Sequence, residues 1–229
     1  MHLLINKKKI YFYIISFFIL SSIFNLNLKN SNNNLFLIKT FIVEGSREDI
    51  KLDFKKKLNL IGKNIFNLNK DEINLKIENS TFLKNIEIKK IYPSKLLVVI
   101  EETDLIAKTI IDGKKYFIGK NRKFIPSIDY KSKKNLPNVF GNFEIVDLLN
   151  VIELLKKQNF DVSLIRNFYF HKNRRWDIQL ADQTILKLPS QNLDVALKTY
   201  FLFINKNYLK NNSIIDLRIP NRIIISNEK

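Results

Sequence analysis

The strongest hydrophobic signal lies near the N-terminus, where every residue from 10 to 24 is apolar, aromatic or Ser. Leu26 and Leu28 extend this run to residue 28. Its length is close to the ~20 residues that cross a bilayer as a helix. Lysines 7–9 stand directly before the run, and such a cluster favours the cytoplasm for the N-terminal side. The pattern predicts a cytoplasmic tail at 1–9 and a transmembrane helix at 10–28.

A basic start followed by an apolar run is also typical of a cleaved signal peptide. Cleavage needs small residues after the run, but bulky Ile23 and Phe24 stand there. We therefore favour an uncleaved anchor, although both interpretations place the rest of the chain outside the cytoplasm. The Asn-rich stretch that follows predicts a linker at 29–37.

Between residues 38 and 104 the apolar spacing changes from the strand period to the helical period and back. Strands are predicted at 38–44, 86–91 and 95–102, with a turn at 92–94 between the last two. Two helices lie between the first and second strands. This order suggests two helices covering a three-stranded sheet, as in a POTRA domain. Its expected core comprises Phe54, Leu58, Ile73, Val98 and Ile100.

Both helices of this segment carry candidate caps. The first is predicted to open at Ser46 in a capping box with Asp49, and to end at Gly62 with Ile61 on its apolar face. The second is predicted to follow Asn69 as its N-cap, with Glu72 in the reciprocal position.

The remaining segment, 105–226, predicts a mixed or antiparallel β domain with two helices. An Asp112-Gly113 turn joins strands at 105–111 and 114–118. Further strands are predicted at 122–125, 166–171, 174–180, 184–188, 214–218 and 222–226. One helix follows Asn142 as its N-cap, and the other starts near Ser190. The second helix carries an apolar face of Leu193, Leu197, Tyr200, Phe201 and Ile204. The whole chain is therefore predicted to be α+β.

Composition argues against several function classes. The net charge is +17, but the lysines are spread along the chain, so nucleic-acid binding is not favoured. Cysteine is absent, which removes disulfides, thiol nucleophiles and thiolate metal sites. His2 and His171 are too far apart in sequence to form a metal pair on one element. We expect no catalytic, cofactor-binding or metal-binding residue and no small-molecule substrate.

Four local features admit a functional and a structural interpretation, and the structural one is favoured each time. Glu101 and Glu102 are neighbours in a strand, so they point to opposite faces and cannot share acid–base work. Trp176 alternates with core residues and should pack among them. The basic run 131–134 is expected to be a solvated loop, with lipid headgroups as the lesser alternative. His171 is expected at the surface or at a sheet edge.

A series of short motifs, in order, resembles the FtsQ/DivIB family. The series comprises Val43-x-Gly45, the stretch 62–68, Ile86-x-Ile88-x-x-Ile91-Tyr92-Pro93-x-x-Leu96-x-Val98-x-Ile100, Glu102 with Ala107, the stretch 136–141, and Ile215-Asp216-Leu217-Arg218. The sequence departs from the family pattern at Thr103, Leu105 and Gly119, where the family usually has Arg, Pro and Asp.

This resemblance implies a non-catalytic scaffold of the bacterial division assembly. The protein would be a single-pass type II protein of the cell inner membrane, with a cytoplasmic N-terminus and a periplasmic bulk at the division septum. Its implied partners are FtsB and FtsL, with FtsK and the septal synthase FtsW/FtsI beyond them. Through these partners the protein would help to control septal peptidoglycan synthesis.

The last predicted strand, 222–226, is expected to lie at a sheet edge, where unpaired backbone groups could accept a partner strand. The candidate partner-binding residues are Arg218, Ile219, Arg222, Ile223, Ile224, Ile225 and Ser226. An edge that is merely solvated is the simpler alternative. Two other functions stay open: a POTRA protein for outer-membrane protein assembly or polypeptide transport, and an envelope enzyme.

Overall fold

The computed structural model describes residues 7–23, 36–132, 134–204, 213–220 and 222–227. The chain forms two compact units: the first draws on residues 1–78 and 86–100, and the second on 79–85 and 101–229. Helices and mixed sheets are both present, so the predicted α+β class is confirmed.

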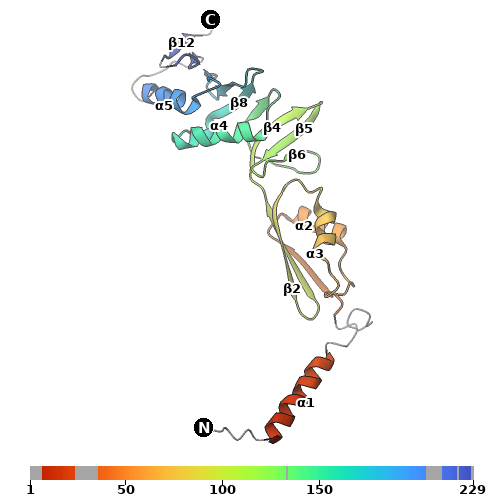
Figure 1. Ribbon diagram of the computed structural model, residues 1–229. Coiled ribbons are helices and arrows are strands. Elements are labelled where there is room, and N and C mark those ends of the chain that lie inside the picture. The colour runs from red at the N-terminus through yellow and green to blue at the C-terminus, as the bar shows by residue number, and fades with distance from the viewer. Residues whose placement is uncertain (1–6, 24–35, 133, 205–212, 221, 228–229) are drawn as a thin grey trace, which may run out of the picture. The chain divides into compact units, whose positions relative to one another are not determined.

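Helix α1 (Lys7–Ile23) covers the N-terminal apolar run (Figure 1). It begins before the predicted position because the lysines at 7–9 are good helix formers and continue the helix. Residues 24–28 of the predicted span and 1–6 of the predicted tail lie outside the described residues. Of the helices that the structure describes, none combines the length and the apolar character that a membrane span needs.

The first unit has the predicted order of elements. Strand β1 (Thr40–Glu44) is followed by α2 (Glu48–Leu58), α3 (Lys70–Ile77), β2 (Leu83–Ile91) and β3 (Lys95–Glu102). The sheet order is β1-β3-β2, and β1 runs parallel to β3 (Figure 1). All five predicted core residues are buried: Phe54, Leu58, Ile73, Val98 and Ile100. Gly45 follows β1 at φ +87°, and a Cβ there would collide with the carbonyl of Ile100.

The predicted ends of α2 are wrong. Arg47 is the N-cap residue and makes no side-chain cap, so Ser46 opens no capping box. Glu48 and Asp49 in the first turn instead place negative charge at the positive end of the helix dipole. Asn59 ends the helix in the left-handed conformation, so Ile61 lies beyond it and is exposed. At α3, by contrast, Asn69 caps as predicted and accepts a hydrogen bond from the Asp71 amide at 2.9 Å.

The second unit is built on a nine-stranded sheet in the order β12-β11-β10-β9-β8-β7-β4-β5-β6. The strands are β4 (Leu105–Ile111), β5 (Lys114–Gly119), β6 (Phe124–Pro126), β7 (Asn138–Phe140), β8 (Ile165–Phe170), β9 (Trp176–Leu180), β10 (Ile185–Lys187), β11 (Ser213–Asp216) and β12 (Ile224–Asn227). Strand β7 runs parallel to both neighbours, and β10 runs parallel to β11. The other described pairs are antiparallel.

Parallel neighbours need a long crossover connection, and in two of these three pairs the connection contains a helix. Helix α4 (Ile145–Lys157) connects β7 to β8, and α5 (Leu193–Ile204) connects β10 to β11 (Figure 1). Both helices contribute to one core with the sheet. A short 3₁₀ helix (Val162–Leu164) precedes β8.

Several details of the second unit differ from prediction, and the last strand, β12, begins at Ile224 instead of residue 222. The N-cap residue of α4 is Glu144, not Asn142, and it makes no side-chain cap. Strand β6 starts at Phe124, since Arg122 stands in a left-handed turn at φ 63°. The motif stretch 136–141 contains strand β7, which was not among the predicted strands. Such a short strand between Pro137 and Gly141 gives no periodic signal.

Candidate partner-binding site

Strand β12 is the last strand at one edge of the nine-stranded sheet, as predicted for the C-terminal strand. It pairs antiparallel with β11, with Asp216 opposite Ile224 and Ile215 opposite Ile225. No described strand pairs with its other side. The backbone groups on that side are therefore available to a partner strand.

A single apolar row crosses the sheet and ends at this edge. In register it comprises Val139, Phe168, Ile178, Leu186, Ile215 and Ile225. The first five side chains are fully buried, whereas Ile225 is 41% exposed. Ile223, two residues earlier and therefore on the same face, packs partly against the core. One further strand would cover Ile225 and continue the row.

A groove of about 480 Å³ lies in the same region of the unit, between the start of α5 and the segment that leads into β12. We call it the arginine groove, because Arg175, Arg218 and Arg222 line it. Other residues that line the groove include Ser190, Val195, Thr199, Ile219 and Pro220. Among the described residues that line it none is acidic, so it is suited to a negatively charged group.

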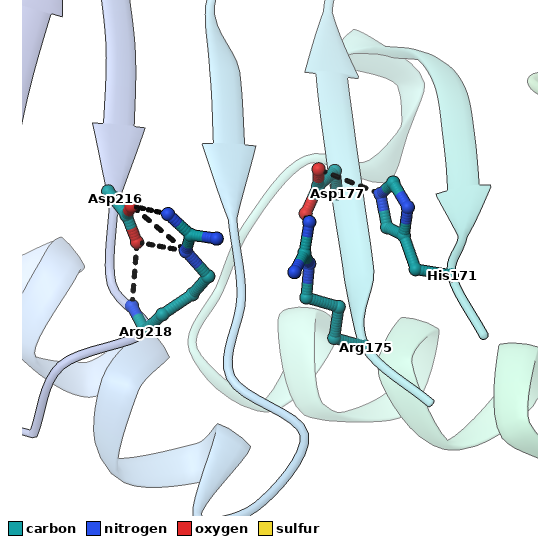
Figure 2. Close-up of polar contacts among 5 residues, drawn as sticks. All are labelled: His171, Arg175, Asp177, Asp216 and Arg218. Atoms are coloured by element: carbon teal, nitrogen blue, oxygen red, sulfur yellow. Dashed lines mark hydrogen bonds and ion pairs between the residues drawn. The ribbon is translucent and has the colours of Figure 1, made fainter. Parts of the chain in front are cut away.

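Asp216, at the end of β11, fixes the position of Arg218 (Figure 2). The Arg218 Nε donates to both Asp216 carboxylate oxygens, at 2.8 and 2.9 Å, and its terminal nitrogen also donates to Oδ2. The Arg218 amide donates to Oδ1 at 3.0 Å. The Arg218 hydrogen bonds hold the pKa of Asp216 below its usual range, although burial opposes this shift. The guanidinium is thus oriented before any partner arrives.

Asp177, on strand β9, contacts two further basic side chains, His171 and Arg175 (Figure 2). Its Oδ2 lies 2.8 Å from the His171 Nε2, and its Oδ1 lies 3.5 Å from the Arg175 Nε. The carboxylate is almost fully buried, whereas His171 is part-exposed. A buried carboxylate is stable when cations surround it. Asp177 therefore holds Arg175 beside the groove.

These two carboxylates belong to one cross-strand ladder. Asp177 lies opposite Lys187, and Lys187 lies opposite Asp216. Alternating charges on neighbouring strands attract each other. The ladder ends at Ile224, which faces Asp216 from β12 and is exposed. The edge therefore presents an isoleucine on each face, next to a cationic groove.

The structure brings the predicted site residues together. Arg218, Ile219 and Arg222 line the groove, and Ile224, Ile225 and Ser226 are exposed on β12. Sequence reasoning missed Arg175, Asp177 and Asp216 as members of this site. The Asp-x-Arg spacing of 216 and 218 was a usable signal, since residues two apart in an extended chain lie on one side.

The other candidate features have structural partners. Glu101 pairs with Lys84, and Glu102 accepts a hydrogen bond from Tyr130. The two carboxylates thus have separate partners, as predicted from their positions on opposite faces of the strand. Trp176 is buried and contacts Phe168 and Phe170 as expected. Across the described ranges, no group of three or more His, Cys, Asp or Glu side chains could hold a metal ion.

Comparison with known proteins identifies this architecture. Residues 110–218 match the family model of the C-terminal domain of cell division protein FtsQ/DivIB. Cell division protein FtsQ of Rickettsia bellii is 28% identical over 200 residues, which cover 83% of this chain and 72% of that protein. The FtsQ protein of Rickettsia typhi is 26% identical over 194 residues, with the same coverage. That of Bradyrhizobium diazoefficiens is 22% identical over 160 residues, covering 69% and 47%.

The matched residues include strands β5 to β11 and helices α4 and α5, whereas β12 follows them. These matches confirm the resemblance to the FtsQ/DivIB family that the sequence motifs predicted.

Proposed function

We propose that the protein is a non-catalytic scaffold of the division assembly at the inner membrane. Residues 10–28 would anchor it, 29–37 would link the anchor to a POTRA domain at 38–104, and 105–226 would bind partners. The family supports the division role. The apolar run behind three lysines supports the anchor and a cytoplasmic N-terminus.

The partner is captured by β-augmentation at β12. The observation that carries this proposal is the buried apolar row that ends in exposed Ile225. An added strand would pair with the free side of β12 through its backbone and cover Ile225 with an apolar residue. Carboxylates on the same partner segment would enter the arginine groove and pair with Arg175, Arg218 or Arg222.

The partner segment should therefore alternate apolar and polar residues and carry acidic side chains. We assign this role to the FtsB–FtsL pair. Through it the protein would act on the septal synthase FtsW/FtsI and on peptidoglycan synthesis. The relatives named as cell-division proteins favour this role over outer-membrane protein assembly.

The test is capture of the FtsB–FtsL pair by the full chain carrying proline at Ile224 or at Ile225. Neighbouring N–H groups on an edge strand point in opposite directions, so only one of the two points toward a partner. Proline at that position should abolish capture while the thermal melt stays near that of the parent. Proline at the other position should lower the melting temperature, because it removes a hydrogen bond to β11.

Ile224→Val and Ile225→Val are the matched controls. Each keeps the N–H and most of the apolar surface, so capture should stay close to that of the parent. If every proline variant folds and captures the pair like the parent, β12 is not the dock.

A further inference from the structure

Three aromatic rings from distant segments form one cluster on the first unit. Phe36 meets Phe66 edge to face, with ring centroids 4.9 Å apart. Phe66 stacks on Tyr92 at 5.0 Å with an interplanar angle of 22°. None of these residues belongs to the predicted core of the unit. We call this cluster, together with Ile61 and Ile91, the aromatic end.

Backbone hydrogen bonds bring these segments together. The Ile65 amide donates to the Phe36 carbonyl, and the Ile38 amide donates to the Lys63 carbonyl, both at 2.9 Å. The Lys39 amide donates to the Ser94 carbonyl at 2.8 Å. The start of β1, the loop before α3 and the β2–β3 turn thus meet at one end of the unit. This is the end at which the described chain arrives at residue 36.

The side chains of the aromatic end stay exposed although their rings contact each other. Phe66 is 43% and Tyr92 is 56% exposed, although their rings stack on each other. Outside α1, the exposed large apolar residues described in the first unit are Leu52, Ile61, Phe66, Leu75, Ile91 and Tyr92. Four of these six belong to the aromatic end. Single exposed apolar side chains are ordinary, but a group of them marks a contact surface.

Lysines border the same surface. Lys39 and Lys95 are exposed and flank the β2–β3 turn, where Lys95 lies opposite Thr40 in the sheet register. Lys63 and Lys89 also lie in these segments, each in an ion pair with a glutamate. Aromatic rings bordered by lysines are the combination that settles at a bilayer surface, with the rings among the headgroups and the ammonium groups near phosphate.

We propose that the aromatic end rests on the bilayer, with Phe36, Phe66 and Tyr92 at headgroup level and Lys39 and Lys95 on anionic phospholipids. This inference rests on the proposed membrane anchor. The stretch from Ile23, the last residue of α1, to Phe36 reaches at most ~45 Å when fully extended. A lipid surface is therefore within reach of this end.

The cysteine-free chain allows a direct test, because one introduced thiol can be labelled alone. A fluorophore is attached to the full chain at Ile61→Cys, or at Leu75→Cys as the matched control on α3. The two sites are similarly exposed, at 64% and 70%. The protein is reconstituted into vesicles of phosphatidylethanolamine and phosphatidylglycerol that contain lipids with a nitroxide near the headgroup. Contact with the bilayer predicts several-fold stronger quenching at position 61 than at 75.

Two further variants test the named side chains. In the Ile61→Cys background, the pair Phe66→Ser and Tyr92→Ser should reduce the quenching to the level of the Leu75→Cys control. The pair Lys39→Gln and Lys95→Gln should reduce it in these vesicles but not in phosphatidylcholine vesicles, which carry no net charge. Circular dichroism and a thermal melt check that each variant folds.

Alkaline extraction of the same vesicles separates this inference from the anchor. Protein that resists alkali but shows equal quenching at 61 and 75 keeps its anchor and contradicts the lipid contact. Protein that alkali removes, but that shows the stronger quenching at 61 beforehand, contradicts the anchor and supports the contact.

Discussion

The two edges of the nine-stranded sheet differ, although they belong to one unit. At one edge, β6 ends in Pro126, which has no N–H to offer a further strand. Ile125 is fully buried there. At the other edge, β12 contains no proline, and Ile225 is left 41% exposed. The first edge is closed to a partner, and the second is open.

Side-chain contacts strengthen this contrast. Asn121, in the turn before β6, donates from its side-chain nitrogen to the carbonyls of Thr81 and Leu83, both at 2.9 Å. The turn is thereby fixed to other parts of the unit. Near β12, the fixed groups are instead cations that face a groove. A sheet with one protected edge directs strand pairing to the other.

Phe168→Ala should have the largest effect, because both edges depend on the same core. Phe168 is fully buried on β8, near the middle of the sheet. Its truncation should lower the free energy of unfolding by ~3–5 kcal/mol. Urea unfolding followed by circular dichroism measures this. A change below about 1 kcal/mol would place Phe168 outside the core.

Arg218→Ala should weaken partner capture roughly 10- to 100-fold, as expected for an arginine at the centre of a contact. It removes the oriented guanidinium and leaves Asp216 with only the hydrogen bond from the backbone amide of residue 218. Arg218→Lys should weaken partner capture less than Arg218→Ala does. Lysine keeps the positive charge but lacks the planar guanidinium that can pair with a carboxylate at two points. Arg166→Ala, exposed on β8, is the control and should not change the affinity measured by titration. An equal loss in both alanine variants would indicate a general charge effect.

Asp216→Asn should cost about 0.5–1 kcal/mol at neutral pH, the value of a part-exposed ion pair. The pKa of Asp216 is lowered in the folded state, mainly by hydrogen bonds from Arg218. Its contribution is therefore complete above the unfolded pKa of about 3.9 and is lost as the pH falls through the folded pKa. The difference in unfolding free energy between parent and variant should be constant above about pH 5 and shrink below pH 4. If the difference in unfolding free energy between parent and variant grows as the pH falls, the pKa of Asp216 is not lowered by folding.

Ile128→Ser should have almost no effect and tests the closed edge. Ile128 follows β6 and is 88% exposed. Its loss should change the unfolding free energy by no more than about 0.5 kcal/mol and leave capture of the partner unchanged. Reduced capture at normal stability would show that the β6 edge also binds, and the contrast between the edges would fail.

Strong periodic signals allowed much of the fold to be predicted. Strand 95–102 matches β3 at both ends, because Leu96, Val98 and Ile100 alternate with their neighbours. The helix and strand order of the first unit follows from similar patterns. The starts of helices were harder to predict: Ser46 and Asn142 are good capping residues in isolation, yet the N-caps are Arg47 and Glu144, one and two residues later. Propensity is weak compared with tertiary packing.

Only part of the candidate site could be predicted, because its residues come from segments that are distant in the sequence. The predicted residues Arg218, Ile219 and 222–226 lie close together in the sequence, so one edge-strand argument led to all of them. Arg175 lines the groove from the residue before β9, and its position depends on buried Asp177 and on the order of strands β9, β10 and β11. The parallel pairs β7–β8 and β10–β11, connected through α4 and α5, contribute to this order. Such long-range pairings cannot be obtained from local spacing.

Hydrogen exchange of the full chain, with and without the FtsB–FtsL pair, tests the central claim most directly. The amides at 224–227 that face away from β11 should exchange fast in the free protein and slowly in the complex, because a partner strand would bind them. The amides of Phe124 and Ile125 on β6 should exchange alike in both states. Unchanged exchange across β12 in a verified complex, or new protection at β6 instead, would contradict the assignment of β12 as the partner-binding edge.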